Sequence, residues 1–220
     1  MAKKKKKTGT KSPATKKERP AKKRPARKAE GPLERERLYP YVAAHASTWE
    51  LGHGAFVDLV VDRGSVVSNL SRAELEAAGL DLIEARELAI ANLAAEIGQV
   101  QAQVYEAPEG FPFLVWDSHW LAASSLLLPG LHAFAAQQLD ATKLLASIPH
   151  RDALLIFPEG DAAQRAAMAR MIEENEGQGD APITAEFFAL LPDRVLPFAG
   201  KRRPAPGPRG KTAPPRWFSE

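Results

Sequence analysis

Two short polar stretches hold the side chains best suited to chemistry in this sequence. Pro149-His150-Arg151-Asp152 and Asp117-Ser118-His119 each lie at the end of an apolar run that is typical of a strand. Because loops at strand ends present polar groups, we interpret them as one candidate patch for a ligand or a partner. A histidine flanked by carboxylates could serve as a general acid or base near neutral pH. The patch residues are Asp117, His119, His150, Arg151 and Asp152.

A structural role for the same residues is the alternative interpretation. Arg151 and Asp152 would then fix a tight turn through hydrogen bonds and a local ion pair. Asp117 or Ser118 would cap the helix that follows. The sequence alone leaves the two interpretations open.

Motifs with a defined chemistry do not occur in this sequence. It has no cysteine, which excludes disulfides, thiolate metal sites and cysteine nucleophiles. It also lacks the HExxH, GxSxG and GxxxxGK[ST] patterns. His45 and His53, with Glu50 between them, are the nearest approach to a metal-ligand set, and surface or half-buried histidines explain them more simply. We therefore predict no cofactor, no metal site and no catalytic residue, which favours a non-enzymatic protein without deciding the point.

Charge divides the sequence into three blocks. Residues 1–30 carry 14 Lys or Arg and 2 acids, a net charge of +12, whereas residues 31–200 carry 10 and 24, a net charge of −14. Residues 201–220 carry 6 and 1, a net charge of +5. The sequence therefore predicts an acidic domain with basic ends. Two hundred and twenty residues suit one medium domain with tails.

The basic N-terminal segment contains no Leu, Ile, Val, Phe, Trp or Tyr. Without apolar side chains to bury, we expect it to be disordered and to bind DNA, RNA or another polyanion by releasing counterions, without reading the base sequence. Its composition resembles that of linker-histone-like tails. There are three alternatives to polyanion binding. The segment could be a solubilising extension, a nuclear localisation signal or a tail that folds back on the acidic domain. The cations predicted to contact the polyanion are Lys3, Lys4, Lys5, Lys6, Lys7, Lys16, Lys17, Lys22, Lys23, Arg24, Arg27 and Lys28.

The C-terminal block is rich in proline and ends near two aromatic residues. Its prolines begin at Pro204 and rule out a helix or a central strand. Trp217 and Phe218 could dock either on the domain or on a partner. The predicted organisation is a disordered tail over residues 1–31, an acidic domain over 32–200 and a basic proline-rich tail over 201–220.

Hydrophobic patterning within the domain alternates between hairpins and helices. Ser71 and Glu74 form the capping-box pattern S-R-A-E, which predicts the start of a short helix. An uncharged run over residues 118–139 is long enough for a membrane span, but Pro129-Gly130 at its centre favours two buried helices. The remaining predicted strands cover residues 55–61, 65–68, 100–105, 111–117, 143–148, 153–157, 185–191 and 195–198, and the remaining helices cover 82–97 and 161–174.

Hairpins interspersed with helices indicate the α+β class. We predict a single domain with a mixed or mainly antiparallel sheet. Trp49, Trp116 and Trp120 are predicted at the core or its edge. The acidic run Glu173, Glu174, Glu176 and Asp180 is predicted to be a solvated helix end.

Three stretches in the C-terminal half resemble an uncharacterised bacterial family, the YtpQ-like proteins. They are SSLLLPGLHAFAAQQL (residues 124–139), SIPHRDALLIF (147–157) and PITAEFFALLPDRVLPF (182–198). The resemblance implies one fold unit and a bacterial cytoplasmic setting, and it supplies no catalytic residues.

Three functional hypotheses follow from these observations. The first is a cytoplasmic, non-enzymatic interaction module that the basic tail tethers to nucleic acid, near the nucleoid. The second is a hydrolase or transferase that uses His150 with Asp152 or Asp117. The third is an adaptor or immunity-type protein whose acidic domain binds a basic partner. None of the three involves a membrane.

Overall fold

A computed structural model describes residues 33–45, 49–176, 179 and 181–199. The chain divides into two units, Met1–Gly31 and Pro32–Glu220, and all described residues belong to the second. The predictions for the basic N-terminal segment and for residues 201–220 lie outside the described residues. Within them the chain forms helices and antiparallel sheets, so the predicted α+β class is confirmed.

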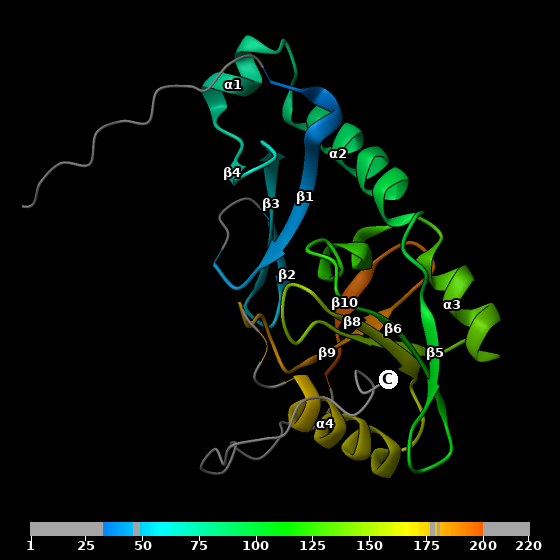
Figure 1. Cartoon of the computed structure of the whole chain (residues 1–220). Helices are drawn as coiled ribbons and strands as arrows, with labels where there is room; N and C mark the ends of the chain where they lie inside the picture. Colours follow the sequence, from blue (N-terminus) through cyan, green and yellow to red (C-terminus); the bar gives the residue numbers. More distant parts are fainter. Residues whose placement is uncertain (1–32, 46–48, 177–178, 180, 200–220) are drawn as a thin grey trace, which may run out of the picture. The chain divides into compact units, whose positions relative to one another are not determined.

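The first sheet has four strands, and the longest of them, β3, pairs with each of the other three (Figure 1). β1 pairs with one side of β3, while β2 and β4 pair with it as well, all antiparallel. β1 contains Pro40, a residue that is confined to edge strands because it cannot donate a ladder hydrogen bond. The strand bounds are β1 Leu38–Ala43, β2 Trp49–Gly52, β3 Ala55–Asp62 and β4 Val67–Asn69.

The second sheet has six strands in the order β10-β9-β7-β8-β6-β5, and each neighbouring pair is antiparallel. Its central strands β7 and β8 are buried on both faces, which explains their unbroken apolar runs. At the edge strand β5, Val104 is 51% exposed. The bounds are β5 Gln103–Glu106, β6 Pro112–Trp116, β7 Leu144–Ser147, β8 Leu154–Pro158, β9 Phe187–Leu190 and β10 Val195–Pro197.

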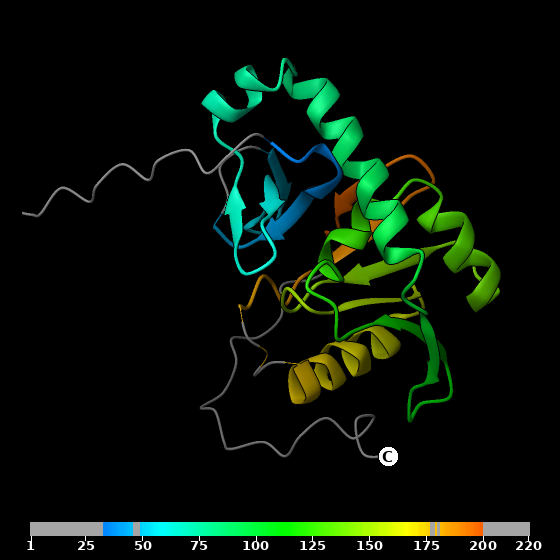
Figure 2. The ribbon, with the colours of Figure 1, turned by 45° about the horizontal axis from the view of Figure 1, so that its top comes forward.

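Helices cover both faces of the second sheet. α4 packs on one face through Met168 and Ile172, whereas η2 and α3 pack on the other, together with β1 and the end of α2 (Figures 1 and 2). The predicted break at Pro129 is confirmed, since it separates η2 from α3. The helices are η1 Arg35–Arg37, α1 Arg72–Ala77, α2 Leu82–Ile97, η2 Ala123–Leu127, α3 Leu131–Leu139 and α4 Ala162–Glu176, η1 and η2 being 3₁₀ helices.

The predicted capping box is present at the start of α1. The Ser71 hydroxyl accepts the Glu74 backbone N–H at 3.2 Å, while the Glu74 carboxylate accepts the Ser71 N–H at 2.9 Å. α2 and α4 begin in the same way at Asp81 and Asp161. Each cap satisfies backbone donors that the first turn of a helix leaves free.

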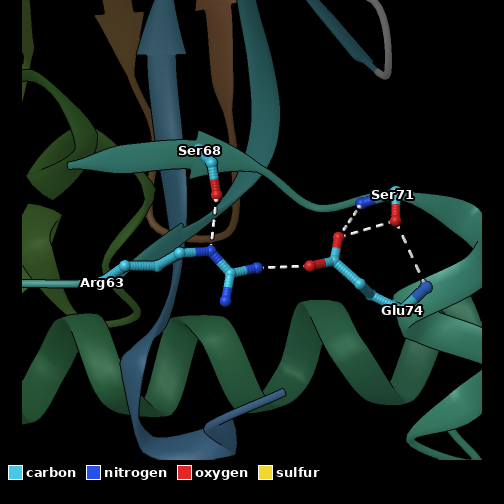
Figure 3. A network of polar contacts seen from close by, with 4 residues as sticks. All are labelled: Arg63, Ser68, Ser71 and Glu74. Atoms are coloured by element: carbon cyan, nitrogen blue, oxygen red, sulfur yellow. Dashed lines mark hydrogen bonds and ion pairs between the residues drawn. The ribbon is translucent and has the colours of Figure 1, made fainter. Parts of the chain in front are cut away.

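The Ser71–Glu74 cap belongs to a larger set of contacts at the end of the first sheet (Figure 3). The Arg63 guanidinium donates to the Ser68 hydroxyl at 3.0 Å and forms an ion pair with Glu74. We call Arg63, Ser68, Ser71 and Glu74 the hairpin cluster, because it joins the β3–β4 hairpin to α1. Burial acts to raise the pKa of Glu74, but hydrogen bonds from Ser71 and the Arg63 charge outweigh it and lower that pKa.

None of the helices in the described part of the chain has the length and apolarity needed to cross a membrane.

Candidate functional site

The turn between β7 and β8 carries the predicted patch residues His150, Arg151 and Asp152. Backbone hydrogen bonds hold this turn from two sides. The Arg151 N–H donates to the carbonyl of Ala181 at 3.3 Å, and the Arg151 carbonyl accepts the N–H of Ala123 at 3.1 Å. The turn is therefore fixed both by the segment that leads into β9 and by η2.

His150 uses both of its ring nitrogens inside the protein. Its Nδ1 accepts the backbone N–H of Asp152 at 3.3 Å, so Nε2 carries the proton and donates to Glu176 Oε2 at 2.6 Å. The two side chains are only 12% and 6% exposed. In addition, a Cβ placed on Gly179 would lie 2.2 Å from His150 Cδ2, which shows how closely the backbone after α4 covers the ring. His150 thus fastens the end of α4 to the β7–β8 turn.

Arg151 links the same turn to the first sheet. Its Nε donates to Asp152 Oδ1 at 2.8 Å and its Nη2 to Asp152 Oδ2 at 3.3 Å. Its side chain also hydrogen-bonds Tyr41 of β1, and these contacts raise the pKa of the guanidinium. The ion pair within the turn is the contact that the structural interpretation of Arg151 and Asp152 predicts.

Asp117 adds a half-buried acid whose charge interacts with that of Glu176. It follows β6 and precedes Ser118, whose φ of 58° is unusual for a residue other than glycine. Burial is the main cause that raises the pKa of Asp117, and the charge of Glu176 raises it further. Hydrogen bonds from Ser118 and from the Asp117 backbone act in the opposite direction. We call Asp117, His150, Arg151, Asp152 and Glu176 the junction cluster, because it joins both sheets and α4.

His119, the remaining patch residue, pairs with a different element. Its Nε2 lies 3.6 Å from the Glu96 carboxylate of α2, and its Nδ1 accepts the Leu121 N–H at 3.2 Å. The prediction that Asp117 or Ser118 caps the next helix was wrong, since η2 begins after Ala122 without a side-chain cap. The predicted patch is therefore only partly one site.

Sequence reasoning missed Glu176, which it had placed at a solvated helix end. In the structure Glu176 is buried, whereas Glu173 and Glu174 of the same run are exposed. A signal for this was present in the sequence, because Met168, Ile172 and Glu176 recur at intervals of four and so share one face of α4. Tyr41 had no such signal, since its partner Arg151 lies far away in the sequence.

The other predicted histidine positions do not build a metal site in the structure. Among the described residues no group of three or more His, Asp or Glu side chains could hold a metal ion. His53 lies in the turn between β2 and β3. Its ring centre is 5.4 Å from that of Phe188, and its Nε2 is buried without a hydrogen-bond partner in the described part of the chain. The predicted placement of Trp49, Trp116 and Trp120 at the core or its edge is confirmed.

Comparisons with family models, with curated proteins and with solved structures found no match to this chain, so the YtpQ-like resemblance stays a prediction from its motifs.

Proposed function

We propose that the protein is a non-enzymatic interaction module that its Lys-rich N-terminal segment holds on a nucleic acid. The observation that carries this proposal is the charge distribution, with a net charge of +12 over residues 1–30 and −14 over residues 31–200. Counterion release favours binding of such a polycation to DNA or RNA, while the acidic domain repels phosphates. Contact with the nucleic acid is therefore confined to the basic segment.

The junction cluster supports this proposal over acid–base catalysis through His150. A general base needs a free lone pair within reach of the proton that it removes. His150 Nδ1 is occupied by the Asp152 N–H, and the Nε2 proton is directed to Glu176. Arg151 and Asp152 likewise satisfy each other. The arrangement favours a role in holding the domain together.

The test is binding of a labelled, nonspecific DNA duplex to the full chain across a salt series. We expect log affinity to fall linearly with log salt, with a slope of about −0.9 per phosphate neutralised. Replacing Lys3, Lys4, Lys5, Lys6 and Lys7 by Gln should weaken binding and make the slope shallower by about 4.5.

A matched control removes the same number of positive charges from the exposed surface of the domain. It carries Gln at positions Arg35, Arg72, Lys143, Arg170 and Arg194. We expect this variant to bind with an unchanged salt slope. Equal loss in both variants, or no binding by the full chain, would contradict the proposal.

A further inference from the structure

An apolar surface follows the N-terminal half of α2 and belongs to neither polar cluster. Leu82 and Ile83 are 45% and 70% exposed, although both are large aliphatic residues. Two grooves of about 370 and 430 Å³ adjoin here and share Leu82. Exposed aliphatic side chains beside grooves are typical of a surface that is covered by something else. We call the second groove the α2 groove; it is lined by Trp49, Leu82, Ile83, Arg86, Glu87 and Ile90.

The walls of the α2 groove are fixed by contacts within the domain. Asp81 caps α2 through the backbone N–H groups of Ile83 and Glu84, at 2.8 Å each. The Arg86 guanidinium lies 5.5 Å from the centre of the Trp49 ring, within range of a cation–π contact. Trp49 in turn packs against two hydrophobic core clusters of the domain. The groove is therefore preformed, which lowers the entropic cost of binding in it.

The last described strand, β10, runs beside β2, whose first residue lines the α2 groove. A Cβ placed on Gly52 would lie 2.2 Å from Pro197 Cγ, so these two residues touch. Gly52 and Trp49 are the two ends of β2, about 10 Å apart in an extended strand. From Phe198, the 18 residues that precede Trp217 can span up to about 60 Å. The C-terminal segment can therefore reach the groove with ample slack.

Residues 201–220 match the groove in apolarity and are opposite in charge to the domain as a whole. Trp217 and Phe218 are the only large apolar side chains after Phe198, and Arg216 precedes them directly. The segment carries a net charge of +5, opposite in sign to the domain. Tryptophan and arginine are enriched among the residues that contribute most of the binding free energy at protein interfaces.

We propose that Trp217 and Phe218 of this chain dock in the α2 groove. Docking buries Ile83 and places the C-terminal end on the first sheet and its helices. The proposal does not depend on nucleic-acid binding by the N-terminal segment, so either one can fail without the other.

Disulfide trapping in the full chain tests the docking, because the natural sequence has no cysteine that would interfere. The test variant carries Glu87→Cys and Ser219→Cys, which puts one thiol on the groove and one beside the anchors. The matched control carries Glu106→Cys and Ser219→Cys, with the first thiol on the exposed edge strand β5. Docking raises the effective concentration of the two thiols only in the first variant. We expect its intramolecular disulfide to form at least about tenfold faster than that of the control.

Two further variants separate docking from random encounters of a flexible end. In the Glu87→Cys, Ser219→Cys background, Trp217→Ala with Phe218→Ala should reduce the rate to that of the control, and so should Ile83→Glu. The Ile83 side chain is 70% exposed, so this substitution leaves the core intact. Equal rates in the test and control pairs would overturn the proposal. A disulfide-linked dimer in place of the intramolecular bond would also overturn it, and would assign the groove to a second copy.

Discussion

The junction cluster and the hairpin cluster both join separate elements of the fold, but they differ in their balance of positive and negative side chains. The hairpin cluster pairs one cation, Arg63, with one anion, Glu74, and spans twelve residues of sequence. The junction cluster contains three acids against one arginine and a histidine whose Nδ1 accepts a hydrogen bond. Its members come from distant parts of the chain. The hairpin cluster, whose residues are close in the sequence, has equal numbers of positive and negative side chains. The junction cluster, whose residues are far apart in the sequence, has more acids than cations.

The two clusters also differ in what they hold. The hairpin cluster fixes α1 to the β3–β4 hairpin, so its loss should affect one end of the first sheet. The junction cluster connects α4, the β7–β8 turn and β1, so its loss should affect the whole domain. Substitutions that break each cluster in turn should therefore differ in size.

The largest effect is expected from Glu176→Ala. This change leaves the His150 Nε2–H buried without its acceptor, and a buried donor of this kind costs about 2–3 kcal/mol in the free energy of unfolding. Urea denaturation followed by circular dichroism measures it. Glu176→Gln, which keeps an acceptor oxygen, should lose less.

Glu174→Ala is the matched control, because Glu174 lies two residues away on the exposed side of α4. We expect it to change the free energy of unfolding by less than about 0.5 kcal/mol. If the two alanine variants were equally destabilised, the contact between His150 and Glu176 would not be what holds α4.

An intermediate effect is expected from breaking the hairpin cluster. Glu74→Gln removes the charge that Arg63 pairs with and weakens the Ser71 contacts, and it should cost about 1–2 kcal/mol. Because the pKa of Glu74 is lowered in the folded state, this stability is present above the ordinary pKa of glutamate and is lost as the pH falls through the folded pKa. Urea denaturation at several pH values follows the loss.

A nearby exposed pair provides the control for that substitution. Arg72 and Glu76 lie 2.8 Å apart on the surface of α1, at 91% and 65% exposure. Glu76→Gln should cost no more than about 0.5 kcal/mol, since solvent screens an exposed pair. A cost equal to that of Glu74→Gln would mean that the β3–β4 hairpin does not depend on its cluster.

The same contrast shows what the sequence could predict. The S-R-A-E cap, the hairpins and the break at Pro129 follow from spacing within a few residues, and the structure confirms them. β1 was not predicted, because Pro40 argues against a strand unless its position at an edge is known. Tyr41 and Arg151 meet only after both sheets have formed, and no local pattern encodes that meeting.

The spacing of histidines and acids also gave an incomplete candidate site. It included His119, which pairs elsewhere, and it left out Glu176. His119 follows β6 just as Asp117 does, yet it turns to Glu96 of α2. Glu176 looked like one of several solvated acids, although the spacing from Ile172 places it on the buried face. Burial of a polar residue depends on a partner across the fold, which spacing within one element cannot supply.

The smallest effect is expected from Asp117→Asn, and it is a gain. Burial and the charge of Glu176 raise the pKa of Asp117 above its ordinary value of 3.8. Below that value the carboxyl is protonated in both states, and as the pH rises the unfolded chain loses its proton first, so stability falls. Asparagine removes this loss. The melting temperature of the variant should equal that of the natural protein near pH 3.8 and exceed it by about 1–2 °C at pH 7.

A combined variant identifies the source of that gain. If Glu176 contributes to the raised pKa, Asp117→Asn should stabilise a Glu176→Gln background less than it stabilises the natural protein, because one of the two repelling charges is already gone. Glu186→Gln, at an exposed position, should show no pH-dependent gain in either background. An undiminished gain would assign the effect to burial alone, and the excess negative charge of the junction cluster would then carry no cost.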